Sequence, residues 1–378
     1  MSPSVPRLAR LSLLAAACMA LAPADTQAAN LYWDANGANA GVGGTGSWDT
    51  TSAFWSSGVA GLDAAPVGAF TDADQAYFAG SSGVVTLAAP STIGGLVFVG
   101  DGFRLAGATL TLASADPQVA PEIFVGRALL AELAVSLAGN DGFTKTGSGA
   151  LRLTAAGTYA GLTTIANGSL ILTRGDALGA DPSVVTILGS ATRGSAGGQL
   201  VLAGGVTLAR DLSLQGLGPI ADRSGTVVSV GDNTLAGAVA GAVGLMNNRL
   251  IADGGLLTLA GSLDIAGSAG TQFVTFGGLN AKGIGNYALT GVLTGTGSLN
   301  KESGGTLILS PTDTSGFSGT IRSSAGTIRV ESLSALGTRT ASGTSGVIDL
   351  NGGSFEFRSD NPNFGSTRNV YNRGGTTS

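Results

Sequence analysis

The stretch FTKTGSGALRLTAAGTYAGLTTIANGSLILTRGDALGA, residues 143–180, returns later in the chain as LNKESGGTLILSPTDTSGFSGTIRSSAGTIRVESLSALGT, residues 299–338. Both copies contain short runs in which Leu, Val or Ile alternates with other residues, as in Leu151-Arg152-Leu153 and Leu307-Ile308-Leu309. A period of two is typical of strands with one buried face. Each copy therefore predicts three or four short strands joined by tight turns.

The two copies match position by position. Lys145 aligns with Lys301 and Gly149 with Gly305, and the second copy then carries two extra residues in its turn. The remaining matches are Leu151 and Leu153 with Leu307 and Leu309, Tyr159 with Phe317, Gly161 with Gly319, Gly168 with Gly326, Leu170 and Leu172 with Ile328 and Val330, and Ala177-Leu178-Gly179 with Ala335-Leu336-Gly337. A weaker copy lies at residues 250–269. Such units cannot bury their apolar faces alone, so they are expected to stack.

Stacking of these units predicts an all-β fold, a right-handed parallel β-helix. At about 20–25 residues per coil, the chain without its leader gives roughly 14–17 coils and a rod of roughly 70 Å. The alternatives are a β-sandwich or a propeller, but no regular blade repeat with aromatic signatures occurs. Residues 127–135, RALLAELAV, are open to two interpretations: one or two helical turns, or another strand.

The N-terminus has the order of a secretory signal peptide. Arg7 and Arg10 precede the apolar run of residues 11–22, and small residues follow at 26–29. Cleavage is expected near residue 28 or 29, with the position after residue 24 as the alternative. Cys18 lacks the Leu three residues earlier that lipidation favours. The predicted organisation is a signal peptide at 1–28, a cap with the first coils at 29–100, and a β-helix at 101–378.

Composition excludes several kinds of chemistry. The chain has no His, and its single Cys lies inside the predicted signal peptide, so Ser-His-Asp and Cys-His sites are excluded and disulfides are unavailable. Charged residues make up 11% and lie scattered, so no basic stripe exists for nucleic acid. Although Gly is frequent, a hydrophobic fraction of 43% argues against disorder. We therefore predict no catalytic, cofactor-binding or metal-binding residues.

Both copies resemble the autotransporter-associated β-strand repeat, with the pattern K-x-G-x-G-x-L-x-L, a turn, an aromatic residue, a strand and A-G-x-L-x-L. Lys145, Gly147 and Gly149 fit it, whereas Ser303 replaces the first Gly in the second copy. The stretches at 32–34, 43–49 and 54–55 are similar to the W-D, G-G-T-G-x-W-D and W pattern that begins such proteins, and residues 74–107 resemble the same leader.

The resemblance implies a β-helical passenger of a Gram-negative bacterium, exported and then displayed on the outer membrane or released. Such passengers are normally followed by a C-terminal membrane barrel, and the segment NPNFGSTRNVYNRGGTTS at residues 361–378 shows no run of alternating strands. The chain is therefore expected to be the N-terminal part of a larger protein, or to use a separate pore. We expect a monomer with a surface partner of unknown identity, a host or bacterial glycan or protein.

Two aromatic or adhesive motifs are candidate binding sites. Trp33, Trp48 and Trp55 lie close together near the expected mature N-terminus, and they predict either a platform for sugar rings or a cap over the first coil. The cap is favoured, because an open end would expose both core and edge. The tripeptide Arg174-Gly175-Asp176 is of the integrin-binding type, but such a tripeptide can also arise by accident in a chain this rich in Gly, and it falls where the repeat turns.

The acidic residues give weaker candidates. Asp72 and Asp74 are either calcium ligands or part of a solvated loop. The run Gly43-Gly44-Thr45-Gly46 begins like a calcium nonapeptide, but Trp48 stands where that repeat needs Asp. Acids are too dispersed to predict the clustered carboxylates of a polysaccharide-cleaving enzyme.

Three functions remain open. The first is a structural or adhesive surface passenger acting as a rigid stalk, which we expect not to be an enzyme. The second is a carbohydrate-binding or polysaccharide-cleaving β-helix. The third is a segment that mainly assists folding and secretion of the passenger.

Overall fold

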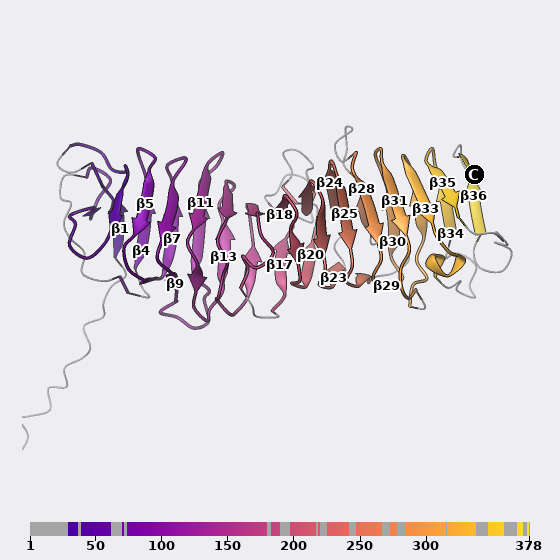
Figure 1. The fold of residues 1–378 in the computed structure, drawn as a ribbon, viewed down its shortest axis with the longest axis horizontal. Helices are drawn as coiled ribbons and strands as arrows, with labels where there is room; N and C mark the ends of the chain where they lie inside the picture. The colour runs from indigo at the N-terminus through magenta and orange to yellow at the C-terminus, as the bar shows by residue number, and fades with distance from the viewer. Residues whose placement is uncertain are drawn as a thin grey trace, which may run out of the picture.

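The computed structural model describes residues 29–36, 39–61, 70–71, 74–179, 183–189, 197–216, 218–219, 225–241, 247–266, 273–277, 284–314, 316–337, 347–358, 369–372 and 376–377. The predicted signal peptide with Cys18, and Asp72, fall outside these ranges, as does most of the C-terminal stretch from residue 359. Within the described part the chain forms a long rod of stacked parallel strands (Figure 1).

Three walls of strands run along the rod, and we call them the first, second and third face. The first face is a 12-stranded sheet, formed by β1 (Asn30–Trp33), β3 (Trp55–Ser56), β4 (Gln75–Phe78), β7 (Gly95–Phe98), β10 (Glu122–Val125), β13 (Phe143–Thr146), β15 (Thr163–Ile165), β17 (Val185–Leu188), β20 (Leu212–Gln215), β23 (Val239–Gly241), β26 (Leu263–Ile265) and β29 (Leu293–Gly295).

The second face is a 14-stranded sheet that spans about 60 Å at the usual strand spacing. It is formed by β2 (Gly46–Trp48), β5 (Val84–Leu87), β8 (Arg104–Gly107), β11 (Leu130–Ala134), β14 (Ala150–Leu153), β16 (Gly168–Leu172), β18 (Gly198–Ala203), β21 (Val227–Val230), β24 (Asn248–Asp253), β27 (Phe273–Phe276), β30 (Ser298–Lys301), β32 (Ile321–Ser323), β34 (Val347–Leu350) and β36 (Asn369–Asn372).

The third face is split into two sheets. Near the N-terminus it has three strands, β6 (Ser91–Ile93), β9 (Leu110–Leu112) and β12 (Leu137–Ala138). Farther along it has eight strands, β19 (Thr207–Leu208), β22 (Asn233–Leu235), β25 (Leu256–Leu259), β28 (Asn286–Leu289), β31 (Thr306–Leu309), β33 (Thr327–Val330), β35 (Ser354–Phe357) and β37 (Thr376–Thr377). From β4 to β12 and from β17 to β31 the strands visit the first, second and third face in turn, whereas β13 to β16 alternate between the first and second face and β30 to β37 between the second and third.

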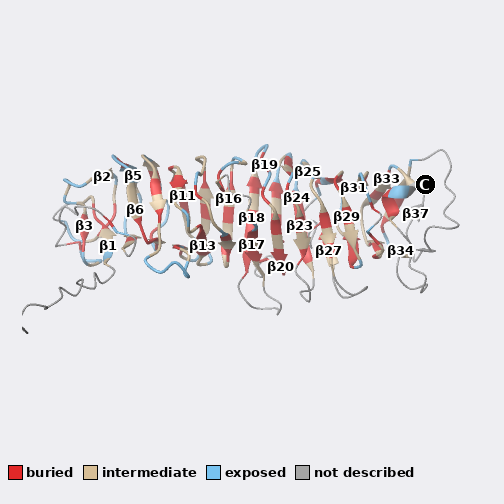
Figure 2. Ribbon diagram, turned by 90° about the horizontal axis from the view of Figure 1, so that it is seen from below, coloured by how far each residue is buried: buried red, intermediate tan, exposed pale blue. Residues whose placement is uncertain are grey.

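Inward-facing aliphatic residues form continuous ladders that make up the core. On the second face Leu133 pairs with Leu153, Leu153 with Leu172 and Leu172 with Leu202. Coils of 19 and of 30 residues therefore follow one another in the same sheet. One hydrophobic cluster extends from Trp33 to Phe355, and Figure 2 shows buried segments along the whole rod. Each fully buried aliphatic side chain contributes about 1.5–3 kcal/mol. The predicted fold class, an all-β parallel β-helix, is confirmed.

The stretch 127–135 forms a strand and not a helix. Its residues 130–134 are β11, in which Ala131 and Leu133 are buried and their neighbours are partly exposed. Register with the strands on both sides fixes this conformation, since Leu133 pairs with Leu105 and with Leu153. In the described part of the chain the one helical turn is the 310 turn η1 (Leu333–Leu336). No helix found there is long and apolar enough to cross a membrane.

An aromatic cluster closes the N-terminal end of the rod. Trp33, Trp48 and Trp55 are at most 3% exposed, and Trp55 lies edge-on to both of the others at ring distances of 5.2 and 4.9 Å. The short strand β3 pairs antiparallel with β1, the only antiparallel pair among the described strands, and Trp55 stands opposite Trp33. An edge strand of this kind ends the sheet, so the predicted aromatic cap is confirmed.

The division predicted at residue 100 is not visible as a break. On the first face β7 pairs with β10, and on the second β5 pairs with β8 and β8 with β11. The parallel ladders thus continue through this position, and the boundary of the predicted domains stays a prediction.

Candidate functional site

The lysine of the first repeat copy is buried in the rod and bound by backbone carbonyls. Lys145 is 0% exposed, and its Nζ donates to the carbonyl oxygens of Thr146 at 2.6 Å, Gly147 at 2.8 Å and Asn167 at 3.1 Å. Thr146 is the last residue of β13, Gly147 opens the turn after it, and Asn167 belongs to the next coil. The ammonium therefore closes its own turn and ties two coils together.

The lysine of the second copy does the same within its own turn. Lys301 is also 0% exposed, and its Nζ donates to the carbonyl oxygens of Glu302 at 3.0 Å, Ser303 at 2.7 Å and Gly304 at 2.7 Å. Its ammonium also stands 5.7 Å from the ring centre of Tyr287 in the preceding coil. The next coil approaches closely too, since a Cβ on Gly326 would lie 2.9 Å from the Lys301 Nζ.

Burial changes the acidity of both ammonium groups. It lowers the pKa of Lys145 to about 7 and that of Lys301 to about 8, the latter opposed by the nearby Glu302 carboxylate. A charge without water is costly unless hydrogen bonds replace it. Three carbonyl acceptors use all three N–H bonds of a protonated lysine, so this cage favours the charged form. We call each lysine with its three carbonyls a lysine clamp.

The two copies occupy different faces of the rod. In the first copy Lys145 lies on β13 of the first face and is followed by β14 of the second face. In the second copy Lys301 lies on β30 of the second face and is followed by β31 of the third. The same sequence motif is thus displaced by one wall. Both clamps close the local turn, the Lys145 clamp also reaches the adjacent coil, and neither depends on a particular face.

Where the second copy lacks the first glycine of the motif, Ser303 adopts a left-handed backbone conformation. Gly147 has φ +69°, and Ser303 at the equivalent position has φ +66°. Non-glycine residues avoid this left-handed region because Cβ approaches the following carbonyl oxygen, which costs about 1–2 kcal/mol. There is also no room for a side chain at Gly147, since a Cβ there would lie 2.1 Å from the carbonyl oxygen of Val125.

The aromatic position of the repeat changes together with its neighbour. In the first copy the buried Tyr159 hydroxyl lies 2.7 Å from the Thr163 hydroxyl, and burial raises the pKa of Tyr159 to about 12. In the second copy Phe317 and Ile321 occupy the equivalent positions, and both are fully buried. A hydrogen-bonded pair has been exchanged for an apolar pair, which leaves no hydroxyl unsatisfied.

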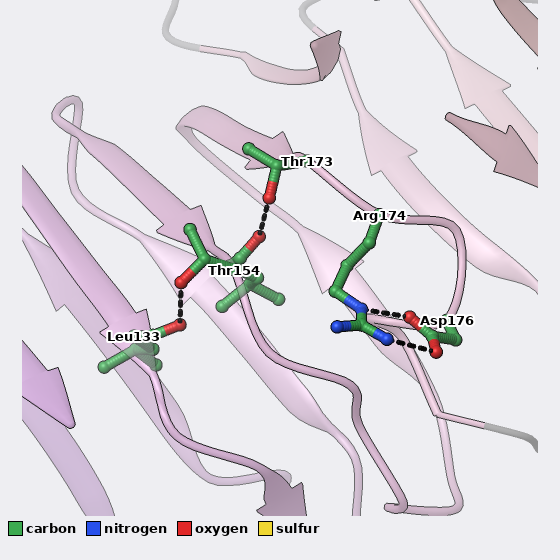
Figure 3. A network of polar contacts seen from close by, with 6 residues as sticks. Leu133, Thr154, Thr173, Arg174 and Asp176 are labelled. Atoms are coloured by element: carbon green, nitrogen blue, oxygen red, sulfur yellow. Dashed lines mark hydrogen bonds and ion pairs between the residues drawn. The ribbon is translucent and has the colours of Figure 1, made fainter. Parts of the chain in front are cut away.

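The tripeptide 174–176 is folded back on itself. Arg174 Nε and Nη2 donate to Asp176 Oδ1 at 2.5 Å and Oδ2 at 2.8 Å, as Figure 3 shows. In the same corner Thr154 and Thr173 donate to carbonyl oxygens of the preceding coils. Both side chains stay about half exposed, so this pair is weak and would not by itself keep a receptor from contacting them. The role of the tripeptide stays a prediction.

The acidic candidates have local structural partners. Asp74 Oδ1 accepts from the Ala29 N–H at 3.1 Å, and its Oδ2 accepts from the Thr71 N–H at 2.7 Å. Gly43 has φ +109°, and a Cβ there would lie 2.3 Å from the carbonyl oxygen of Ser81. Asp74, through its hydrogen bonds, and Gly43, through its lack of a side chain, therefore let backbone segments come together at the N-terminal end. In the described ranges no three acidic, His or Cys side chains are grouped closely enough to hold a metal ion.

Two buried arginines were not singled out from the sequence. Arg210 donates to the carbonyl oxygens of Leu178 at 2.5 Å and Ser183 at 2.6 and 3.0 Å. Arg249 donates to the carbonyl oxygen of Gly277 at 2.7 Å and to Glu302 at 2.9 Å. Like the lysines, they satisfy carbonyls at corners between coils. A lone Arg between apolar runs carries no sequence signal for this role.

A recurring strand unit set in a capped parallel β-helix defines a β-solenoid repeat protein. The family model described as passenger-associated-transport-repeat matches residues 143–172. The chain is 30% identical over 303 residues to the adhesin BmaC autotransporter of Brucella suis biovar 1 (strain 1330), an alignment that covers 75% of this chain and 9% of that protein. No solved structure shows a significant match. The resemblance found in the sequence is confirmed: this chain is a repeat protein of the autotransporter passenger type.

Proposed function

We propose that the chain is a surface-exposed adhesive passenger whose β-helix acts as a rigid stalk and interaction surface. The observation that carries the proposal is the uninterrupted 14-stranded parallel sheet, because a rod of stacked coils extends without needing a new core. The similarity to a protein named an adhesin supports the adhesive part. The chain spans 9% of that relative's length, so adhesion by this segment is itself part of the proposal.

Adhesion is tested with beads coated with the purified chain. Beads are passed over epithelial monolayers and over bacterial lawns, and retention under flow is counted against albumin-coated beads. Retention well above albumin on either surface is expected. Retention no greater than that of the albumin-coated beads on both surfaces would contradict the adhesive role.

The stalk is tested by removing one coil in register. Residues 239–262 form one such coil, because Val239 and Leu263 are register partners on neighbouring strands. Their deletion is expected to leave bead retention unchanged and to shorten the rod by one strand spacing, about 5 Å, in electron micrographs. Loss of retention would show that this coil is part of the binding surface and not a spacer.

An enzymatic role is tested by release of reducing sugar from mixed plant and bacterial polysaccharides. The proposed role predicts no turnover above a boiled sample. Clear turnover that a single Asp→Asn change abolishes would replace the stalk by a polysaccharide-cleaving β-helix.

A second candidate function is assistance in folding during export. It is favoured by the description of the matching family model and by the clamp that joins two successive coils in that region. Deleting residues 143–162 removes one coil in register, since Phe143 and Thr163 are partners. In the full-length secreted protein this deletion should lower surface yield more than deletion of residues 239–262. Equal yields would refute it.

A further inference from the structure

Three aromatic side chains form an outward-facing column on the first face, in the coils next to the cap. Tyr32 pairs with Tyr77, Tyr77 with Val97, and Val97 with Phe124. They point outward, because the residues that flank Tyr77 and Phe124 on their strands are fully buried in the core. The rings of Tyr32 and Tyr77 are 4.8 Å apart, and Phe124 stands two strand spacings, about 10 Å, beyond Tyr77. All four side chains remain partly exposed.

A polar column runs beside the aromatic one. Gln75 pairs with Gly95, and Gly95 with Glu122. A Cβ on Gly95 would lie 2.3 Å from the Gln75 Oε1, so this glycine leaves room for the amide group to lie along the column. Glu122 is exposed, and the Thr146 hydroxyl donates to one of its oxygens. Among the described residues the Gln75 side chain has no hydrogen-bond partner.

This pair of columns is confined to the N-terminal coils. Beyond Phe124 the aromatic column continues as Thr146, and beyond Glu122 the polar column continues as Thr144, Thr164 and Thr186. The outer surface of one sheet thus changes from aromatic rings with amide and carboxylate groups to a row of threonines. The core beneath these coils is aromatic too, with Phe78 stacked on Phe98, but Tyr77 and Phe124 alternate with the buried residues and point away from it, so packing inside the rod does not explain the aromatic strip.

We propose that this strip binds an extended, neutral polysaccharide that lies along the rod axis. Flat aromatic rings pack against the apolar C–H face of a pyranose, while amide and carboxylate groups bond its hydroxyls. One sugar unit of an extended chain is about as long as the spacing between strands. The proposal deepens the proposed adhesive role, on which it rests, by naming the class of its partner.

Charge and backbone pairing favour this partner over others. Glu122 is the charged group in these columns from β1 to β10, and the whole chain carries a net charge of −5, which disfavours anionic polymers. Strands β4, β7 and β10 are paired on both sides. A peptide therefore cannot add to this region as an extra strand, and the partner must be recognised by side chains.

Native affinity electrophoresis of the purified chain tests the proposal. Gels contain hydroxyethyl cellulose or galactomannan as neutral probes, and alginate as the anionic probe. Retardation by at least one neutral probe and none by alginate is expected. The double change Tyr77→Ala with Phe124→Ala should weaken retardation about tenfold, and Gly95→Leu should weaken it by displacing the Gln75 amide.

The matched control is Phe273→Ala, which removes the same ring from an outward, partly exposed position on the second face. It should leave retardation unchanged, and circular dichroism of every variant reports the fold. The inference is overturned if no neutral probe retards the chain, if the double variant binds like the parent, or if the control loses as much. It is also overturned if these two rings are needed for binding to immobilised collagen but for no polysaccharide. Beads that adhere although no polysaccharide binds would sink this inference and leave the adhesive role standing.

Discussion

The two copies of the repeat share a motif but not a place in the rod. Copy one, residues 143–172, occupies the first and second faces, and copy two, residues 299–330, occupies the second and third. Both bury a lysine among three carbonyls. They differ in the glycine at 147 against Ser303 and in the hydroxyl pair of Tyr159. The comparison teaches that the motif encodes a portable clamp, because any wall of a three-sided coil offers the same turn and neighbour.

The largest expected effect comes from removing either clamp. Lys145→Met and Lys301→Met each leave buried carbonyls without a donor, and each should lower the local free energy of unfolding by about 3 kcal/mol. The readout is hydrogen exchange of peptides from the affected coils, since all three Trp lie in the cap and fluorescence reports that end. Arg152→Met, on an outward position, is the control and should cost under about 0.5 kcal/mol. A large loss for one lysine and none for the other would break the comparison.

Exchanging the residues at positions 147 and 303 should change the stability of the two copies in opposite directions. Gly147→Ala introduces a left-handed alanine and a close contact with Val125, and it should cost about 2–3 kcal/mol. Ser303→Gly relieves the same conformation and should stabilise its coil by about 1 kcal/mol. Hydrogen exchange of both regions measures each change. If Ser303→Gly destabilises its coil, the strain assigned to φ +66° is wrong.

The paired substitution at the aromatic position predicts a smaller effect. Tyr159→Phe leaves the Thr163 hydroxyl unsatisfied and should cost about 1 kcal/mol. Phe317→Tyr should cost a similar amount, and the additional change Ile321→Thr should restore most of it. A double-mutant cycle in which the second change has no effect would separate the two positions.

The smallest predicted difference is one of pH. Both lysines have pKa values near 10.4 in the unfolded chain and about 7 and 8 in the folded one. Between these values the unfolded chain binds the additional proton, so folded stability rises with pH. From pH 7 to 8 the parent should gain about 1 kcal/mol over Lys145→Met and about 0.4 kcal/mol over Lys301→Met. Equal slopes in parent and variants would show that the cage holds both lysines protonated.

The sequence predicted the architecture because that depends on repetition and alternation. Leu151 and Leu153, Leu307 and Leu309 were expected on a buried face and are there. The Trp cluster was expected as a cap, and 127–135 was open between helix and strand until register with Leu105 decided it. The alignment of Lys145 with Lys301 was visible, but their burial was not, because lysine usually marks a solvated position.

The change of face could not be predicted, since coils of 19 and 30 residues occur in one sheet and the position of a strand around the axis depends on every turn before it. Equally, the outward aromatic strip depends on register between Tyr77, Val97 and Phe124, which are far apart in the sequence. Side chains that meet only through stacking carry no local signal.

Cysteine cross-linking tests the portable clamp most directly. In a Cys18→Ser background the chain has no other Cys, and register partners on neighbouring parallel strands, about 4.8 Å apart, suit a disulfide. Thr275 and Asn300 are such partners on the second face, so Thr275→Cys with Asn300→Cys should form a disulfide on mild oxidation. Asp264 lies on the first face, so Asp264→Cys with Asn300→Cys should not. The reverse result would place Lys301 on the same face as Lys145 and contradict the account.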